Sequence, residues 1–266
     1  MKNIKLNNGV QMPQLGLGTW QASDHEIEQS LVWAFEEGYR HIDTAKIYGN
    51  EEAIGRAIKK SGIPRSELFI TTKLWNSDHG NVKKAFETSL KKLGVEYVDL
   101  YLMHWPVAER NQSWKVLEEI YKSGKAKSIG VSNFTVKHLQ ELLKTATVVP
   151  AVNQFELTPY LYDKALCDFC HKKGIAVESY SPLTRGEKLD DKKLVAIAHK
   201  YGKTTAQILI RWCIEHGFIV IPKSTSKKRL NENISVFDFT ISAEDMRTLD
   251  GFNEDFRTCW DPNSMP

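Results

Sequence analysis

The chain has 266 residues, of which 41% are hydrophobic and 26% charged, and its formal net charge is +3 at pH 7. This composition is that of an ordinary soluble protein, and the charge is too small and too evenly spread to indicate a nucleic-acid or membrane-surface partner. Because the N-terminal residues lack the apolar core of a signal peptide and no run of about 18 apolar residues occurs, we expect a cytoplasmic protein that does not span a membrane.

The predicted elements begin with a hairpin, because residues 2–12 alternate around Asn7-Asn8-Gly9, which favours a tight turn. Short apolar runs of the length of a strand then recur along the chain. They lie at about 15–19, 41–45, 68–74, 97–104, 127–132, 149–155, 175–181 and 218–223. Amphipathic segments separate these runs, which predicts an alternation of strands and helices.

The helix candidates carry typical start signals and spacings. Ser23-Asp24-His25-Glu26 has the pattern of a capping box, and the apolar residues after it recur at helical spacing. The interval before the eighth strand is longer and holds two helix candidates, at about 190–201 and 204–216. Two more follow the eighth strand, at about 226–235 and 242–250. We therefore expect extra helices near the C-terminus.

Eight strand–helix units predict an α/β fold with a parallel sheet, and eight strands close a (β/α)8 TIM barrel. The competing fold is a doubly wound open sheet, which usually has the pattern G-x-G-x-x-G after its first strand. The sequence from Gly16 to Trp20 lacks the third glycine, so we favour the barrel. The N-terminal hairpin should plug the bottom of this barrel. No linker divides residues 1–266, so we expect a single barrel domain, and we expect it to be a monomer.

Polar side chains stand at the predicted ends of the strands in the first half of the chain. Asp43 ends the second strand, Tyr48 lies on the loop after it, Lys73 lies inside the third and His104 ends the fourth. Because parallel strands present their C-terminal ends at the same rim, we expect these side chains to converge. Each of them alone also has an ordinary structural explanation. Their joint placement favours a catalytic site.

The chemistry of these four residues suits the reduction of a carbonyl. A lysine in an apolar strand costs free energy unless it is paired, and Asp43 on the neighbouring strand is the natural partner. The Lys73 ammonium should lower the pKa of the Tyr48 phenol and make it a usable general acid. His104 can donate a second hydrogen bond to the same substrate oxygen. We expect the set to deliver a proton to a carbonyl oxygen while hydride arrives at the carbon.

Six short sequences in a fixed order resemble the aldo-keto reductase family. They are Asp-Thr-Ala-x-x-Tyr-Gly-Asn-Glu, Thr-Thr-Lys-Leu-Trp, Leu-Met-His-Trp-Pro, Gly-Val-Ser-Asn-Phe, Asn-Gln-Phe-Glu and Ile-Pro-Lys-Ser. The resemblance extends from about residue 6 to about residue 256. It implies a (β/α)8 barrel that reduces aldehydes and ketones with a nicotinamide cofactor. It also makes Asp43, Tyr48, Lys73 and His104 the catalytic tetrad, with Tyr48 as the proton donor.

The second half of the chain is expected to hold the cofactor. Ser132, Asn133 and Gln154 lie at the ends of the fifth and sixth strands, where their side chains could fix a carboxamide. By resemblance they hold the nicotinamide carboxamide, and the ring stacks on Tyr180. Asn133 could instead cap the helix that follows it.

The phosphate end of the cofactor is expected after the eighth strand. Lysine, serine and arginine at a strand end and a helix N-terminus favour phosphate binding. By resemblance, Lys223, Ser224 and Arg229 hold the adenosine 2′-phosphate, which implies NADPH as the cofactor. Glu232 and Asn233 match family positions near the adenine.

One loop is expected to cross the pyrophosphate. It runs over residues 181–186 and includes Ser181 and Leu183. Arg185 on this loop is a candidate contact to the pyrophosphate.

The substrate pocket should have apolar walls, because Trp20, Trp75 and Trp105 each end or follow a strand at the catalytic rim. The connection at 106–113 and the tail at 257–266 are both short. This shortness resembles the microbial branch that includes diketogluconate and glyoxal-type reductases. We expect an open pocket for small, activated carbonyls, such as dicarbonyls and aromatic aldehydes, with few contacts to the far end of a substrate.

Two other functions stay open on the sequence. One is a Schiff-base lyase with Lys73 as nucleophile, which the adjacent Asp43 opposes because a salt-bridged ammonium stays protonated. The other is a non-enzymatic regulatory subunit that binds NADPH, which the intact tetrad opposes. No residues have the spacing of metal ligands, and Cys167 and Cys170 fall within a helix, so we expect no metal site.

Overall fold

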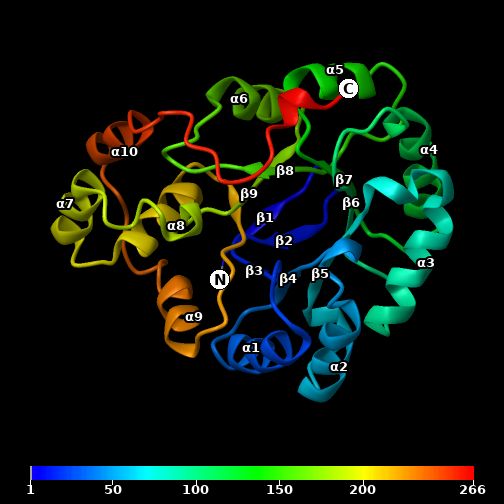
Figure 1. Ribbon diagram of the computed structural model, residues 1–266, viewed down its shortest axis with the longest axis horizontal. Helices are drawn as coiled ribbons and strands as arrows, with labels where there is room; N and C mark the ends of the chain where they lie inside the picture. Colours follow the sequence, from blue (N-terminus) through cyan, green and yellow to red (C-terminus); the bar gives the residue numbers. More distant parts are fainter. Residues whose placement is uncertain (1) are drawn as a thin grey trace.

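Parallel strands form the centre of the computed structural model, which describes residues 2–266 (Figure 1). Within this range the sheet has eight strands, and each pairs with the next along the chain. Their bounds are β3 Leu17–Gly18, β4 His41–Asp43, β5 Phe69–Leu74, β6 Leu100–Met103, β7 Ile129–Ser132, β8 Val152–Glu156, β9 Ala176–Tyr180 and β10 Ile219–Val220. Every strand expected from an apolar run is present, and the predicted parallel sheet is confirmed.

The sheet closes into a barrel. Backbone bridges from Leu15 to Val220 and from Gly18 to Lys223 join its two ends. Gly18 permits this close approach, because a Cβ there would lie 2.8 Å from the carbonyl oxygen of Ile221. The (β/α)8 barrel is therefore confirmed, and the doubly wound alternative is excluded.

Helices form a ring around the strands (Figure 1). Their bounds are α1 Asp24–Glu36, α2 Glu51–Ser61, α3 Val82–Leu93, α4 Arg110–Lys122, α5 Val136–Leu142, α6 Lys164–Lys172, α7 Lys192–Tyr201, α8 Thr205–Glu215, α9 Lys227–Ile234 and α10 Ala243–Asp250. α1 has the predicted capping box, in which Ser23 Oγ accepts from the Glu26 N–H and the Glu26 carboxylate accepts from the Ser23 N–H. The extra helices predicted near the C-terminus are present as α7 to α10.

An N-terminal hairpin covers one end of the barrel. β1 (Asn3–Lys5) and β2 (Gln11–Pro13) pair antiparallel around the predicted turn. Leu6 and Met12 are buried in a small apolar cluster of their own. Its other buried members are Phe69, Leu100, Leu102, Ala151, Val152 and Ile219. Most of these residues lie where strands begin, so the hairpin plugs the N-terminal ends of the strands, as predicted, and leaves the C-terminal ends for a site.

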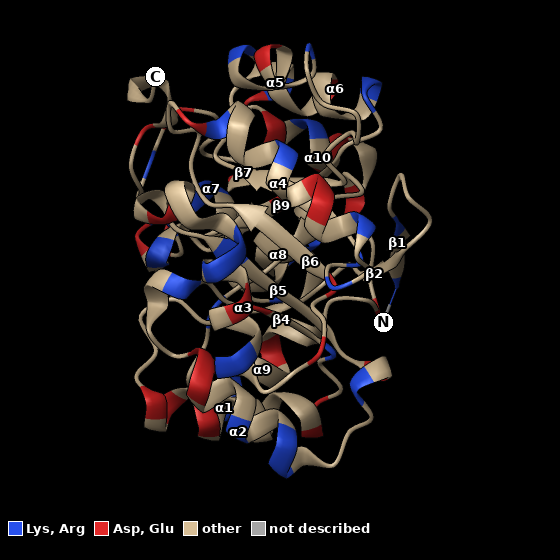
Figure 2. Cartoon of the chain, turned by 90° about the vertical axis from the view of Figure 1, so that its right-hand side faces the viewer, with Lys and Arg blue, Asp and Glu red and all other residues tan. Residues whose placement is uncertain are grey.

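The main core lies between the barrel and the ring of helices. Helix α8 contributes fully buried side chains such as Ile208, Leu209 and Trp212, whose removal from water favours folding. Charged residues lie mainly on the surrounding helices, while the strands are largely uncharged (Figure 2). In the part of the chain that the structure describes, none of the helices combines the length and apolar character needed to cross a membrane.

Candidate active site

The four predicted catalytic side chains meet at the C-terminal ends of neighbouring strands. Asp43 is the last residue of β4, Lys73 lies in β5 and His104 follows β6 directly. Tyr48 ends a short 3-10 turn, η1 (Lys46–Tyr48), on the loop after β4. Because β4 pairs with β5 and β5 with β6, these strand ends lie side by side. The predicted convergence on one rim is confirmed.

Lys73 is at the centre of this group and is fully buried. Its Nζ lies 2.5 Å from Asp43 Oδ1 and donates to the carbonyl oxygen of Thr44 at 2.9 Å. The same Nζ lies 3.4 Å from the hydroxyl of Tyr48. Burial acts to lower the pKa of Lys73, but Asp43 and the other negative neighbours outweigh it and raise that pKa above its ordinary value. Lys73 is therefore a protonated, ion-paired lysine.

The structure corrects the predicted acidity of Tyr48. Burial raises the pKa of Tyr48 to about 12, and the positive charge of Lys73 lowers it only in part. The field of the ammonium is weakened because the Asp43 carboxylate lies 2.5 Å from it. The prediction of a net lowered pKa is wrong, and the free protein keeps this phenol protonated at physiological pH.

His104 adds an uncharged imidazole to the rim. Its ring centre lies 5.7 Å from that of Tyr48 and 5.2 Å from that of Trp75, both edge to face. Burial, together with the charge of Lys73, lowers the pKa of His104 well below its ordinary value. A neutral imidazole keeps one N–H donor, and His104 lines the cavity described below. His104 can therefore donate a hydrogen bond to a ligand without carrying charge.

A buried amide links this group to a carboxyl that the sequence prediction missed. Gln154 Nε2 donates to Asp43 Oδ2 at 2.7 Å and to Glu178 Oε2 at 2.9 Å. Glu178 lies in β9 and is fully buried. Burial and the charge of Asp43 raise the pKa of Glu178 to about 8. The sequence already contained a signal for this carboxyl. A glutamate inside an apolar strand costs free energy unless it has a partner, as was argued for Lys73.

The free energy of unfolding should depend less on pH when Glu178 is replaced by glutamine. In the folded protein the pKa of Glu178 is about 8, above its ordinary value of 4.5, so the folded state binds the proton more tightly. The resulting stabilisation is complete below about pH 4.5 and is lost as the pH rises to about 8. One such proton changes stability by up to about 1.4 kcal/mol per pH unit. Urea unfolding between about pH 5 and about pH 8 measures this slope, and equal slopes in both proteins would contradict the prediction.

A second hydrogen-bonded set lies beside His104. The Tyr180 hydroxyl donates to Asn133 Oδ1 at 2.7 Å. Asn133 Nδ2 donates to the carbonyl oxygen of His104 at 3.0 Å and to Ser132 Oγ at 3.1 Å. Asn133 has a φ of 63°, in the left-handed region that asparagine tolerates better than most residues. This conformation places an amide and a phenol ring together at the wall where the nicotinamide is expected.

These groups open onto a cavity of about 560 Å³. The three tryptophans expected in the substrate pocket, Trp20, Trp75 and Trp105, all line it, so the prediction of apolar walls is confirmed. Ile47 also lines the cavity and is 46% exposed. The cavity therefore combines a polar floor, made by the strand ends, with large apolar walls.

The C-terminal tail forms one side of this cavity. Thr258, Cys259 and Trp260 line it, and the Trp260 ring centre lies 5.7 Å from that of Trp105. Glu156, at the end of β8, holds the tail in place: Oε1 accepts from the Thr258 N–H at 2.8 Å and Oε2 from the Cys259 N–H at 3.0 Å. Because of these bonds the tail reaches the cavity, and the number of side chains that meet the far end of a substrate stays a prediction.

Arg185 contacts the cavity wall. Its guanidinium carbon lies 4.6 Å from the centre of the Trp20 ring, and Nη2 donates to Cys259 Sγ at 3.0 Å. Leu183, on the same loop, packs against the main core. Three non-glycine residues of this loop have positive φ and are strained: Ser181 at 49°, Thr184 at 52° and Arg185 at 52°. The pyrophosphate contact of Arg185 stays a prediction.

The residues expected at the phosphate end of a cofactor lie after β10. Lys223 lines the cavity, Ser224 is buried, and Arg229 is exposed in the first turn of α9. Helix α9 begins without a side-chain cap, and its first turn holds basic residues and no acidic one. A helix N-terminus favours acidic residues, because its first backbone N–H groups have no partner within the helix. An anion bound here would therefore accept hydrogen bonds from these N–H groups and balance the charge of the basic residues. Farther along α9, Glu232 is half-buried and Asn233 is buried.

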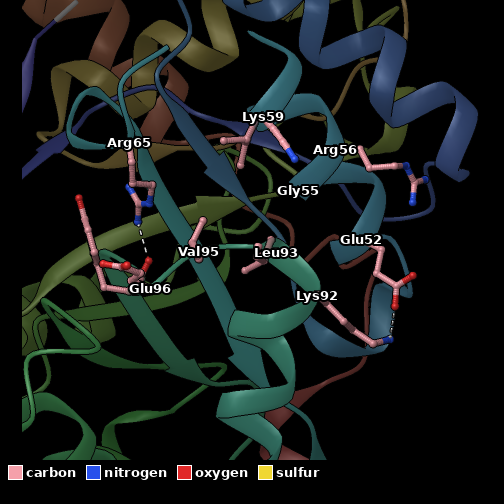
Figure 3. Close-up of a pocket in the computed structure, with 12 residues that line it drawn as sticks. Glu52, Gly55, Arg56, Lys59, Arg65, Lys92, Leu93, Val95 and Glu96 are labelled. Carbon is pink, nitrogen blue, oxygen red and sulfur yellow. Dashed lines mark hydrogen bonds and ion pairs between the residues drawn. The ribbon is translucent and has the colours of Figure 1, made fainter. Parts of the chain in front are cut away.

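A second cavity, of about 660 Å³, lies between α2 and the C-terminal end of α3 (Figure 3). Three of its four basic side chains have carboxylate partners: Arg65 with Asp99 at 2.6 Å, Arg56 with Glu28 at 2.7 Å, and Lys92 with Glu52 at 3.8 Å. It shares none of its lining residues with the cavity at the polar rim. Among residues 2–266 no group of three or more His, Cys, Asp or Glu side chains could hold a metal ion.

Comparison with known proteins gives consistent matches over nearly the whole chain. Residues 14–254 match the sequence model of the Aldo/keto reductase family. The chain is 48% identical to the 9,11-endoperoxide prostaglandin H2 reductase of Trypanosoma cruzi, over 98% of this chain and 95% of that protein. It is 47% identical to the glyoxal reductase of Bacillus subtilis, over 98% of this chain and 96% of that protein. It is similar to the solved structure of the Bombyx mori aldo-keto reductase in complex with NADP, with a TM-score of 0.93, 38% identity, and coverage of 99% and 97% of the two chains.

Proposed function

Because this chain belongs to the aldo/keto reductase family, we propose that it is an NADPH-dependent oxidoreductase that reduces aldehydes and ketones to alcohols. Small activated carbonyls, dicarbonyls and keto-sugars are its proposed substrates. The observation that carries the proposal is the contact chain from Asp43 through Lys73 to the Tyr48 hydroxyl, with His104 on the same cavity. In this proposal Tyr48 is the proton donor, Lys73 is the positive charge that stabilises the resulting phenolate, and His104 is a second hydrogen-bond donor, all around one cavity.

The proposed mechanism gives each side chain one task. The Tyr48 hydroxyl holds the proton that goes to the carbonyl oxygen. The Lys73 ammonium, 3.4 Å away, stabilises the phenolate that remains. Asp43 keeps Lys73 protonated, and the neutral His104 donates a hydrogen bond that orients the carbonyl oxygen. NADPH, when bound, supplies the hydride that reaches the carbonyl carbon.

A pKa of about 12 for Tyr48 is compatible with this task. The group that takes the proton is an oxygen that becomes an alkoxide as hydride arrives, and an alkoxide is a stronger base than a phenolate. A phenol that stays protonated at neutral pH is therefore a permanent proton source. The role of Lys73 is to limit how far burial raises this pKa.

Two features of the free protein fit a nicotinamide dinucleotide phosphate. Asn133, Gln154 and Tyr180 line the cavity beside His104, which supports their role in holding the carboxamide and the ring. The uncapped, basic N-terminus of α9 supports a role of Arg229, with Lys223 and Ser224, in holding the 2′-phosphate.

A panel of carbonyl compounds tests the proposed function. Loss of NADPH absorbance should be fastest with small dicarbonyls and aromatic aldehydes, because the cavity of about 560 Å³ has apolar walls and a polar floor. The relative named glyoxal reductase supports this choice. Binding of NADPH without turnover of any compound would favour the regulatory-subunit alternative. One steroid-sized ketone preferred over every small aldehyde by orders of magnitude would contradict the proposed substrate class.

Borohydride should trap no substrate on Lys73. Lys73 is fully buried and ion-paired with Asp43, whereas a Schiff-base nucleophile must be a free amine. Mass spectrometry after borohydride treatment in the presence of an aldehyde measures this. A covalent adduct on Lys73 would favour the lyase alternative.

Replacing Arg229 with alanine should weaken NADPH binding by about tenfold or more and leave NADH binding nearly unchanged. A charged hydrogen bond to the 2′-phosphate is worth about 1.5–3 kcal/mol, and NADH lacks this phosphate. Titration of both cofactors by tryptophan fluorescence measures the two affinities. Lys227→Ala is a matched control, because Lys227 Nζ lies 2.7 Å from Glu36 Oε2 and already has a partner. Equal losses for both cofactors in Arg229→Ala would assign Arg229 another role.

A further inference from the structure

Glu178 is a buried acid to which the proposed mechanism gives no task. Its side chain is fully buried inside the barrel and has no cation in direct contact. The titratable groups around it are Asp43 and His41 on β4 and Lys73 on β5. Burying a carboxyl beside another carboxylate costs free energy, so its presence calls for an explanation other than stability.

The one strong contact of Glu178 is with Gln154. Gln154 Nε2 lies 2.9 Å from Glu178 Oε2 and 2.7 Å from Asp43 Oδ2. An amide nitrogen has two hydrogens, so both are used by these two oxygens. The only polar group that Gln154 can then offer to a ligand in the cavity is its carbonyl oxygen, Oε1.

The Gln154 amide could also be turned so that its oxygen and nitrogen exchange places, but this orientation is unfavourable. Turned by 180°, it would place its oxygen against two acidic side chains, of which Asp43 is ion-paired with Lys73. Glu178 Oε1 has no hydrogen-bond partner in the described chain, so a proton on Oε1 leaves Oε2 as the acceptor for Gln154. Two acceptors on the same side of Gln154 therefore fix the orientation more firmly than Asp43 alone could.

We propose that Glu178 is a positioning residue: together with Asp43 it holds the Gln154 amide so that Oε1, and not the NH₂ group, faces the carboxamide of a bound nicotinamide cofactor. This rests on the proposed function, because the ligand is the nicotinamide of NADPH. The NH₂ group of a carboxamide can then donate a hydrogen bond to Gln154 Oε1. A ligand group without N–H donors cannot form this bond. Glu178 thereby selects for the carboxamide although it touches neither cofactor nor substrate.

A cofactor analogue isolates this effect. The 3-acetylpyridine analogue of NADP⁺ keeps a carbonyl oxygen in place of the carboxamide but has no N–H donor. The wild-type protein should bind NADP⁺ more tightly than this analogue by roughly three- to tenfold, the worth of one hydrogen bond. In Glu178→Met, which keeps the length of the side chain but has no strong acceptor, that ratio should fall at least about threefold. Tryptophan fluorescence titration measures both affinities without turnover.

Glu178→Gln is the matched control. It removes the titratable carboxyl but keeps an acceptor oxygen for Gln154, and its NH₂ can turn toward His41. Its ratio of affinities should stay close to that of the wild type. Glu178→Leu is a second variant without an acceptor, should Glu178→Met not fold, and it should give the same lowered ratio.

The outcomes separate the two proposals. A residue that only supports the fold would weaken both ligands equally, so an unchanged ratio in Glu178→Met and Glu178→Leu would overturn the positioning role and leave the proposed function intact. A lowered ratio in Glu178→Gln equal to that in Glu178→Met would also overturn it, because the charge and not the acceptor would then matter. A wild-type protein that binds neither NADP⁺ nor the analogue would overturn the proposed function itself.

Discussion

Replacement of Tyr48 by phenylalanine should lower kcat for aldehyde reduction by about 10²-fold or more, with little change in NADPH affinity. The variant keeps the ring that packs 5.7 Å from His104 but removes the only hydroxyl that contacts the Lys73 ammonium among the described residues. The carbonyl oxygen then loses its proton donor. Steady-state kinetics and a fluorescence titration of NADPH separate the two effects.

Tyr97→Phe is a suitable control for this experiment. Tyr97 precedes the N-terminal end of β6, lines the cavity between α2 and α3, and does not line the cavity at the polar rim. Its hydroxyl should therefore be dispensable for turnover. Near-normal kcat in Tyr48→Phe would contradict the assignment of Tyr48 as the proton donor.

Replacement of Lys73 by methionine should lower kcat by about 10²-fold or more and also destabilise the fold. Methionine leaves the Asp43 carboxylate buried without its partner, a change that typically costs about 3–5 kcal/mol. The pKa of Tyr48 should also rise further, because the lowering effect of the lysine charge is lost. In alcohol oxidation, where the phenolate accepts the proton, the pH–rate profile should move to higher pH. A profile in the wild-type position would show that Lys73 does not tune Tyr48.

A double variant separates stability from catalysis. Asp43→Asn combined with Lys73→Met removes the stranded carboxylate, so most of the lost stability should return. Activity should not return, because no positive charge remains near the Tyr48 hydroxyl. Recovery of both would mean that Lys73 serves the fold alone.

The barrel and its polar rim could be predicted because their signals are local. An apolar run defines each strand, and Asp43, Lys73 and His104 sit within or at the ends of such runs. Once eight parallel strands are assigned, their ends must share a rim, and the contact of Lys73 with Asp43 follows from the cost of burying either alone. Glu178 obeys the same rule and could have been found in the same way.

Other features depend on distances that no local pattern encodes. The sequence identifies a lysine near Tyr48 but not the depth of burial, and burial decides the sign of the pKa shift. The place of the tail depends on Glu156, about a hundred positions earlier in the chain, which bonds to backbone N–H groups that every residue except proline possesses. The Thr258 hydroxyl also donates to Glu156 Oε1, but one threonine in the tail does not indicate a partner so far away in the sequence. The contact of Arg185 with Trp20 likewise joins two loops that are distant in the sequence, and the backbone at Arg185 is strained.

The way Glu156 holds the tail has a consequence for how the activity could diversify. The carboxylate binds the backbone N–H groups of Thr258 and Cys259 and the hydroxyl of Thr258, and the side chain of Trp260 makes no bond to it. Mutations at positions 259 and 260 can therefore reshape the cavity wall while the anchor and the catalytic rim remain as they are. Selection, natural or in a library, can explore new substrates at these positions without risking the chemical step, provided that Glu156 is kept.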